Sequence, residues 1–182
     1  MTRQRSSQSR RRGQAMLEFT FVGIPIMFLL ISIFEVSRGM WVYHTLSYSV
    51  KEGVRYAIVH GSDCSPPLTN TCTTTIAKVA QVIKDAGVGL DTGDSKTLLT
   101  FIDGVGGTTT CYLGGGTSPC SAQTGTWPPT GATPPANQVG EVIEIDILTP
   151  FRSAIAMFWP GARGTQVGAY NLGASSSDRI TF

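Results

Sequence analysis

Apolar positions follow two patterns in the first third of the chain. Residues 19–34 form an almost uninterrupted apolar run, and beyond it apolar residues recur at spacings of three and four. Together these patterns predict one helix from about residue 16 to residue 60. About 20 residues are enough to cross a lipid bilayer, so the rest of the helix is expected to project as an amphipathic stalk. Its stripe consists of Val36, Met40, Tyr43, Leu46, Val50, Val54 and Ala57.

The end of the apolar run does not have the form of a secretory cleavage site. Such a site needs small residues on both sides of one position, and the best candidate, Ser37-Arg38-Gly39, has an arginine in the middle. Inside the run, Pro25 cannot donate to the carbonyl of Phe21, which predicts a bend in the helix. Whether this proline has a packing role or is simply tolerated in a membrane helix stays open.

The pattern after residue 60 indicates a small α+β head. Threonines 73–75 offer caps for a second helix over residues 76–86, which ends at Gly87. Residues 142–148 alternate strictly, with three isoleucines on one face, and are the clearest strand. Residues 98–102 form a short strand, 166–172 are a weaker candidate, and 178–182 are a candidate edge strand. The fold class is therefore α+β: a long N-terminal transmembrane and stalk helix, followed by a small head with a second helix and a short antiparallel sheet.

Two stretches of the head have no clear periodicity. Residues 104–138 are rich in Gly, Pro, Thr and Ser and predict a long, largely disordered loop with Tyr112 and Trp127 as possible anchors. Residues 154–159 are apolar but too short to span a membrane. They are expected to pack on the head rather than to lie on the membrane surface.

Charge is distributed unevenly. Five of the 14 basic residues lie within the first 13 positions, which contain no acidic residue, and the remainder has nine basic and 12 acidic residues. A basic tip before an apolar helix predicts a cytoplasmic N-terminus and an exported C-terminus. The mildly acidic body gives no support to nucleic-acid binding. The basic tip consists of Arg3, Arg5, Arg10, Arg11 and Arg12.

All four cysteines follow the apolar run and would lie in an oxidising compartment, where disulfides persist. Of the three possible pairings, we favour the short-loop solution Cys64–Cys72 and Cys111–Cys120. Zinc is the alternative, but neither pair has short ligand spacing, and the two histidines belong to the preceding helix. We therefore expect neither a metal nor another cofactor.

Catalysis has little support in the sequence. Both histidines, His44 and His60, lie on the long helix, and no nucleophile motif occurs. The glycine triplet at 114–116 lacks the lysine and the following helix of a phosphate-binding loop. Three aspartates could in principle meet in the fold, although their spacing does not require it: Asp103, Asp146 and Asp178. We therefore expect that the protein is not an enzyme.

A glycine and a glutamate frame the start of the apolar run. Gly13 follows three arginines, and Glu18 lies five residues later, immediately before Phe19. This layout resembles a type IV prepilin processing site, at which a membrane peptidase would cut after Gly13. The new α-amino group on Gln14 would then lie one helical turn from Glu18. In a filament, that carboxylate can neutralise the amine of a neighbouring subunit, whereas an isolated anchor would use it only to complement the helix N-terminus.

The stretch over residues 10–38 resembles the N-terminus of the TadE-like family, minor pilin-like proteins of tight-adherence (Flp) pilus systems. A second stretch, residues 48–57, is similar to that family's segment at the end of its long helix and contains Glu52, Gly53 and Arg55. The resemblance implies an inner-membrane pilin-like subunit, cut or uncut by the prepilin peptidase, that acts in pilus assembly. Phe19 departs from the tyrosine usual in the major Flp pilins, which leaves recognition by the peptidase open.

The second stretch also has a physical interpretation. Glu52 and Arg55 form an i, i+3 pair worth a few tenths of a kcal/mol on an exposed helix. Gly53 permits the close approach of another backbone, while a solvated helix end would show the same residues.

These expectations divide the chain into a basic leader (1–13), a transmembrane and stalk helix (14–60) and an exported head (61–182). The implied partners are other pilin-like subunits, the pilus assembly machinery, the prepilin peptidase and the lipid bilayer. An uncleaved membrane-anchored binding module without a pilus role is the alternative. It would need the same anchor but neither Gly13 nor Glu18.

Overall fold

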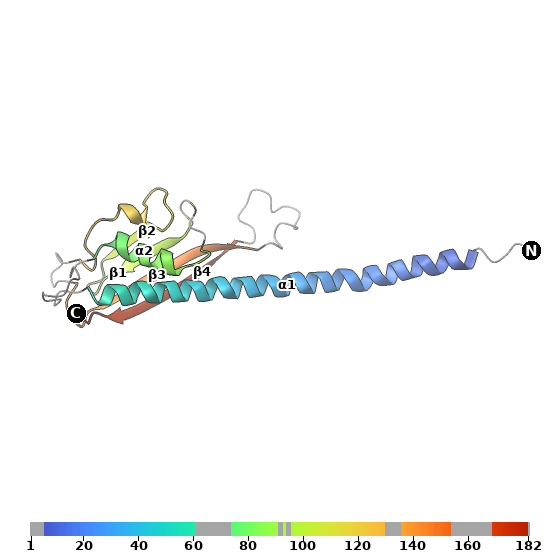
Figure 1. The fold of residues 1–182 in the computed structure, drawn as a ribbon, viewed down its shortest axis with the longest axis horizontal. Coiled ribbons are helices and arrows are strands. Elements are labelled where there is room, and N and C mark those ends of the chain that lie inside the picture. Colours follow the sequence, from blue (N-terminus) through green and yellow to red (C-terminus); the bar gives the residue numbers. More distant parts are fainter. Residues whose placement is uncertain are drawn as a thin grey trace, which may run out of the picture.

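A computed structural model describes residues 6–60, 74–90, 93, 96–129, 136–153 and 169–181. The protein is an α+β molecule in which one very long helix, α1 (Ser6–Ile58), carries a small head on its C-terminal half (Figure 1). The head consists of a second helix, α2 (Ile76–Ala86), and an antiparallel sheet of four strands. This is the fold class that the sequence predicts.

Helix α1 is continuous over 53 residues, which corresponds to about 80 Å at 1.5 Å per residue. It begins at Ser6, earlier than the start near residue 14 that the sequence predicts, so Gly13 lies inside the helix. Pro25 also lies inside it. In the apolar run, the hydroxyls of Thr20 and Ser32 donate to the carbonyl oxygens of Met16 and Phe28, at 2.9 and 2.8 Å. Both polar side chains are therefore satisfied by their own helix.

The head covers only part of the predicted apolar stripe of α1. Leu46, Val50, Val54 and Ala57 are buried in the core, as the stripe predicts. The other three apolar residues of the stripe, Val36, Met40 and Tyr43, are exposed, so the head leaves this part of the stripe uncovered. In this part of the helix the head packs on a neighbouring face, which contains the buried Glu35 and the partly buried Gly39 and Val42.

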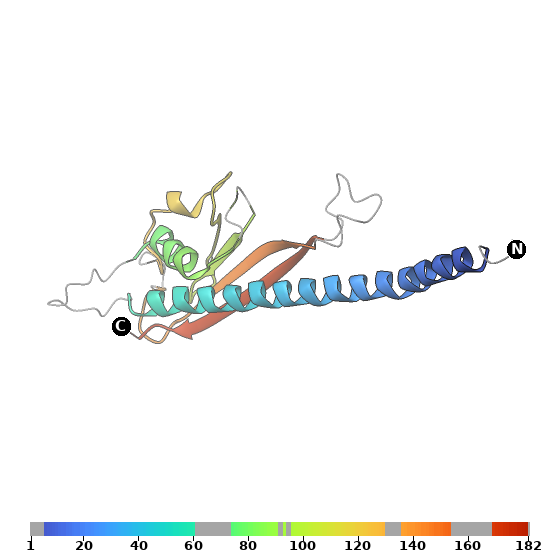
Figure 2. The ribbon, with the colours of Figure 1, turned by 45° about the vertical axis from the view of Figure 1, so that its right-hand side comes forward.

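The sheet has the strand order β2-β1-β3-β4. Strands β1 (Leu98–Ile102) and β2 (Thr108–Tyr112) form a hairpin, and β3 (Val142–Arg152) pairs with β1 on one side and with β4 (Ala169–Arg179) on the other. α1 and α2 pack on the sheet from the same side (Figure 2). Its core-facing side chains are fully buried between the layers: Leu99, Phe101, Ile143, Ile145 and Ile147.

Helix α2 has the bounds that the sequence predicts. The hydroxyl of Thr75 caps its first turn by accepting from the amide of Lys78 at 3.2 Å. At the other end, the amide of Gly87 donates to the carbonyl of Ile83 at 2.9 Å. The predicted apolar face, which consists of Ile76, Val79, Ala80 and Ile83, is the buried one.

Two predictions for the sheet are corrected by the structure. Residues 104–138 do not form one long loop, because β2 lies within them and so does a short 3-10 helix at Cys120–Ala122. The separate candidates at 166–172 and 178–182 are replaced by the single strand β4, which runs through the serines between them and pairs with β3 along its whole length. Continuous backbone pairing with a strong neighbour accounts for this strand better than its own side chains do.

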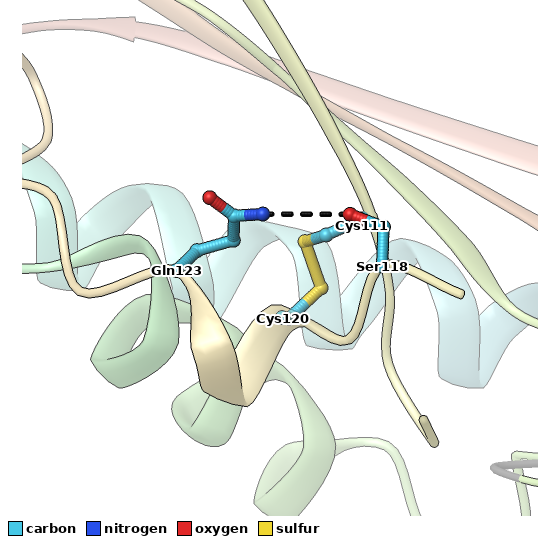
Figure 3. Close-up of a disulfide and its surroundings, with 4 residues drawn as sticks. All are labelled: Cys111, Ser118, Cys120 and Gln123. Carbon is cyan, nitrogen blue, oxygen red and sulfur yellow. Dashed lines mark hydrogen bonds between the residues drawn. A yellow bond between two sulfur atoms is a disulfide. The ribbon is translucent and has the colours of Figure 1, made fainter. Parts of the chain in front are cut away.

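The segment after β2 is held to the core at two points. Cys111 on β2 and Cys120 form a disulfide, beside which the side-chain amide of Gln123 donates to the hydroxyl of Ser118 (Figure 3). This is the pairing that the short-loop solution predicts, whereas Cys64 and Cys72 lie outside the described residues. Trp127 is buried edge-to-face against Phe101, with ring centroids 5.0 Å apart, and is thus an anchor of this segment.

Replacing both Cys111 and Cys120 with alanine is expected to destabilise the head by about 2–3 kcal/mol, because the crosslink restricts a short loop in the unfolded chain. Thermal unfolding of the purified protein in detergent measures the change. Adding a thiol reductant to the wild type should lower its midpoint at least as much. In the double variant the reductant should have a smaller effect, which would come from the predicted Cys64–Cys72 bridge alone. An unchanged midpoint in the variant would contradict a stabilising role for this disulfide.

A candidate membrane and assembly site

The residues around the predicted processing point lie on an exposed part of α1. Apart from Gly13 itself, its two chain neighbours and the nearby backbone of its own helix, no atom of the described chain lies within 4 Å of the position that a Cβ on Gly13 would take. The side-chain amide of the next residue, Gln14, donates to the carboxylate of Glu18, one helical turn further along, at 3.3 Å. Phe19 is exposed. The geometry thus places Gln14 and Glu18 on one face of the helix, free of the head.

The apolar run is exposed on all sides of the helix. Only 6% of its most apolar 18-residue window is buried inside the molecule, and this is the one described helix that is long and apolar enough to cross a membrane. A shallow apolar depression of about 310 Å³ opens at Gly23, where the missing side chain leaves space beside the ring of Phe19. It is lined by Phe19, Thr20, Gly23, Ile24, Met27, Phe28 and Ile31.

The head meets α1 directly after the apolar run. Glu35 is 7% exposed and lies 3.7 Å from a guanidinium nitrogen of Arg38. The guanidinium of Arg38 in turn lies 4.5 Å from the ring centroid of Phe151, at the end of β3. The Phe151 ring also approaches Gly39, to 3.7 Å of the position of a Cβ. This junction of Glu35, Arg38, Gly39 and Phe151 couples the head to the helix.

This junction was not predicted from the sequence. Glu35 stands out in the sequence because no other acidic residue occurs between Glu18 and Glu52, and Arg38 follows it at a helical spacing of three. That signal identifies an ion pair on the helix. It does not identify Phe151, which comes more than a hundred residues later in the chain.

The second family segment lies where α1 packs on the core. Glu52 and Arg55 form the expected pair, with 3.0 Å between their charged atoms. Gly53 is buried against α2, and a Cβ at this position would lie only 2.8 Å from Cδ1 of Ile83 and closer still to Cγ1. What approaches Gly53 is therefore a side chain of α2 rather than a second backbone.

The remaining polar candidates do not converge on a catalytic arrangement. Asp103 accepts from the amides of Val105 and Gly107 at 3.1 and 2.7 Å and so caps the β1–β2 turn. Asp146 and Asp178 occupy opposite faces of the sheet, since Asp178 pairs with Ile143, three residues before Asp146.

Neither histidine joins a cluster. His44 is exposed, whereas His60 is buried, with Nδ1 2.6 Å from the carbonyl oxygen of Tyr56. Among the described residues, no group of three or more His, Cys, Asp or Glu side chains is placed to hold a metal ion.

These features define a class of protein: an α+β head on a single long helix whose other half is apolar and uncovered. Part of this helix also matches a known protein family. Residues 13–55 match the family described as TadE-like protein, so the resemblance seen in the sequence is confirmed for the segment that contains the apolar run and most of the stalk. The match connects the chain with tight-adherence pili and with a structural, non-enzymatic kind of protein. No curated protein and no solved structure gives a significant match.

Proposed function

We propose that this protein is a single-pass, membrane-anchored, pilin-like subunit that takes part in the assembly of a tight-adherence pilus. The observation that carries the proposal is the TadE-like match over residues 13–55. The matched residues form one uninterrupted helix that is uncovered at its apolar end and buried in the head at the other. Its partners are other pilin-like subunits and the pilus assembly machinery.

Insertion of α1 into a bilayer is supported by its length and its hydrogen bonding. Residues 16–34 rise by about 28 Å, close to the hydrocarbon thickness of a membrane. The hydroxyls of Thr20 and Ser32 donate to their own helix, as apolar surroundings require. A cut near Gly39, as in a removable signal peptide, would separate Glu35 from Phe151 and detach the junction. An anchor accounts for these contacts better.

Gly13, Gln14 and Glu18 are assigned to processing and assembly. Gly13 adds no side chain beside the bond that a prepilin peptidase would cut, and no tertiary contact shields it. After the cut, Glu18 would lie one turn from the new amino group on Gln14. A charge carried to the centre of the membrane costs about 2.5–3.5 kcal/mol, so a neighbouring subunit's amine is a favourable partner for this carboxylate.

The mass of the N-terminal peptide of the protein purified from its own membrane tests the processing step. A start at Gln14 is expected. An intact N-terminus in a cell with an active prepilin peptidase would contradict cutting after Gly13. It would leave an uncleaved assembly factor or an anchored binding module as the two explanations.

Orientation gives a second test. The five leader arginines predict that the N-terminus stays in the cytoplasm and that the head is exported across the inner membrane. A phosphatase that is active only outside the cytoplasm is therefore expected to be active when it is fused after Phe182. The matched control is the same fusion with the five leader arginines replaced by glutamine, which should lower this activity. A fusion of a cytoplasm-only reporter at Phe182 that is active would contradict the orientation.

A further inference from the structure

Exposed aromatic side chains gather at the end of the head that lies nearest to the apolar run. Trp41 and Tyr43 on α1 are 53% and 46% exposed, and Tyr170 at the start of β4 is 67% exposed. Val88, in the turn after α2, is 70% exposed. These four residues come from three separate elements and are called here the aromatic base.

Contacts with α1 hold the start of β4 and the turn after α2 at the same height along the helix axis. Tyr170 pairs with Phe151 across the β3–β4 ladder, and Phe151 packs on Arg38 and Gly39. On another side of α1, the ring of Trp41 lies 2.5 Å from the position of a Cβ on Gly89, the residue next to Val88. Both the β4 end and the turn after α2 are thereby held beside residues 38–41 of α1. In Figure 1 the end of β3 and the start of β4 lie beside the middle of α1, at the end of the head that is nearer to the N-terminus.

Helix geometry fixes the height of the aromatic base above the apolar run. Gly39 and Trp41 lie about 8 and 10 Å beyond Phe34 along the axis. Each headgroup layer of a bilayer is about 5–8 Å thick. Side chains on a helix lean toward its N-terminus, so Trp41 and Tyr43 lean back toward the apolar run. If residues up to Phe34 occupy the hydrocarbon, the aromatic base reaches the headgroup layer.

We propose that the aromatic base binds the headgroup region of the lipid bilayer, so that the head rests on the membrane from which α1 emerges. The inference depends on the membrane insertion described under the proposed function. Tyr and Trp are suited to this region because their rings are apolar and their tips form hydrogen bonds. The occupant is lipid because the base is continuous with the membrane-spanning surface.

The contact would restrict the head in a way that the helix alone does not. A single transmembrane helix can rotate about its axis and tilt in the bilayer. The aromatic base has members on α1, on β4 and in the turn after α2, so lipid contact at all of them favours one tilt and one height. The head is thus held in a defined position before it meets another subunit.

Photocrosslinking in lipid vesicles tests this contact. The photoreactive aromatic amino acid p-benzoylphenylalanine replaces Tyr170, Tyr48 or Phe34 in the full chain, one position at a time. Each protein is reconstituted into vesicles of phosphatidylethanolamine and phosphatidylglycerol and is irradiated, and adducts are identified by mass. Tyr48 is the matched control, because it is a similarly exposed tyrosine but lies about 21 Å beyond Phe34 on α1. Protease resistance equal to that of the wild type shows that each variant is folded.

Phospholipid adducts at positions 34 and 170 and none at position 48 are the expected result. A crosslinked dimer at position 170, or no adduct there while position 34 reacts with lipid, would overturn the inference and leave the membrane span intact. Equal lipid labelling at positions 48 and 170 would also overturn it, because the contact would not be confined to the base. No lipid adduct at position 34 would refute membrane insertion and, with it, the inference.

Discussion

Replacing Gly53 with alanine is expected to destabilise the head by about 1–3 kcal/mol, the usual cost of adding a methyl group to a packed core. The added Cβ would fall within 2.8 Å of Cδ1 of Ile83, and Ile83 is fully buried and has little room to turn away. Leucine at position 53 is expected to have a larger effect and to separate α1 from α2. The loss of near-ultraviolet circular dichroism on heating in detergent measures the change.

A matched glycine on the same helix provides the control. Gly39 also faces the head, but a Cβ there would lie at an ordinary 3.7 Å from the Phe151 ring. Gly39→Ala should therefore be neutral or stabilising by up to about 1 kcal/mol, because alanine favours a helix.

A double-mutant cycle tests whether the effect at Gly53 comes from contact with Ile83. Ile83→Ala alone should cost about 2–5 kcal/mol through the cavity that it leaves. In its presence, Gly53→Ala should lose most of its effect, because the colliding atoms are gone. Additive losses in the double variant would show that the close packing on Ile83 is not the cause.

Changing Gly13 or Glu18 is expected to stop pilus assembly at two different steps. Gly13→Leu should block removal of the leader, because a bulky side chain lies beside the bond to be cut, and should leave membrane insertion intact. Glu18→Gln should permit cutting but weaken association, because the amine of a neighbouring subunit loses its counter-charge in a low-dielectric setting. Precursor length on gels and co-purification with pilus components measure the two steps separately.

Gln14→Ala is a useful companion to these variants. It removes the hydrogen bond that the side chain of Gln14 donates to Glu18 but keeps the amino group that cutting would create. Normal assembly in Gln14→Ala together with weak assembly in Glu18→Gln would assign the effect to the charge. A plain membrane anchor predicts that neither Gly13→Leu nor Glu18→Gln changes assembly. If wild type and Gly13→Leu both keep the full-length leader, the proposed processing is wrong.

Elements with strong local signals could be predicted from the sequence. Helix α2 has a capping threonine, an apolar face of helical spacing and a glycine stop, and its bounds match the prediction. The alternating isoleucines likewise identify β3, although pairing with β4 extends the strand to Arg152. In both cases the residues within about ten positions of one another contain the information.

Elements that depend on distant partners could not be predicted in this way. In β2, the one buried residue, Cys111, follows three threonines, so no alternation of apolar and polar residues is visible. In β4, small and polar residues occupy most positions, and the strand is defined by its pairing with β3. The junction was missed for the same reason, because Phe151, which packs on Arg38 and Gly39, belongs to a strand that comes late in the chain. The predicted stripe is uncovered there because the head packs on a neighbouring face of the helix.

Helix α1 runs without interruption from the apolar run to the far end of the head. Pro25 lies within the apolar run, 33 residues before the end of the helix, so about 50 Å of unbroken helix extends beyond it. At Pro25 one backbone hydrogen bond of the helix is missing, which makes this the easiest place for it to bend. With an arm of that length, a bend of only about 10° would carry Ile58 sideways by about 9 Å. In the proposed membrane-anchored state, a small bend at Pro25 would thus move the far end of the head by about the spacing between two packed helices.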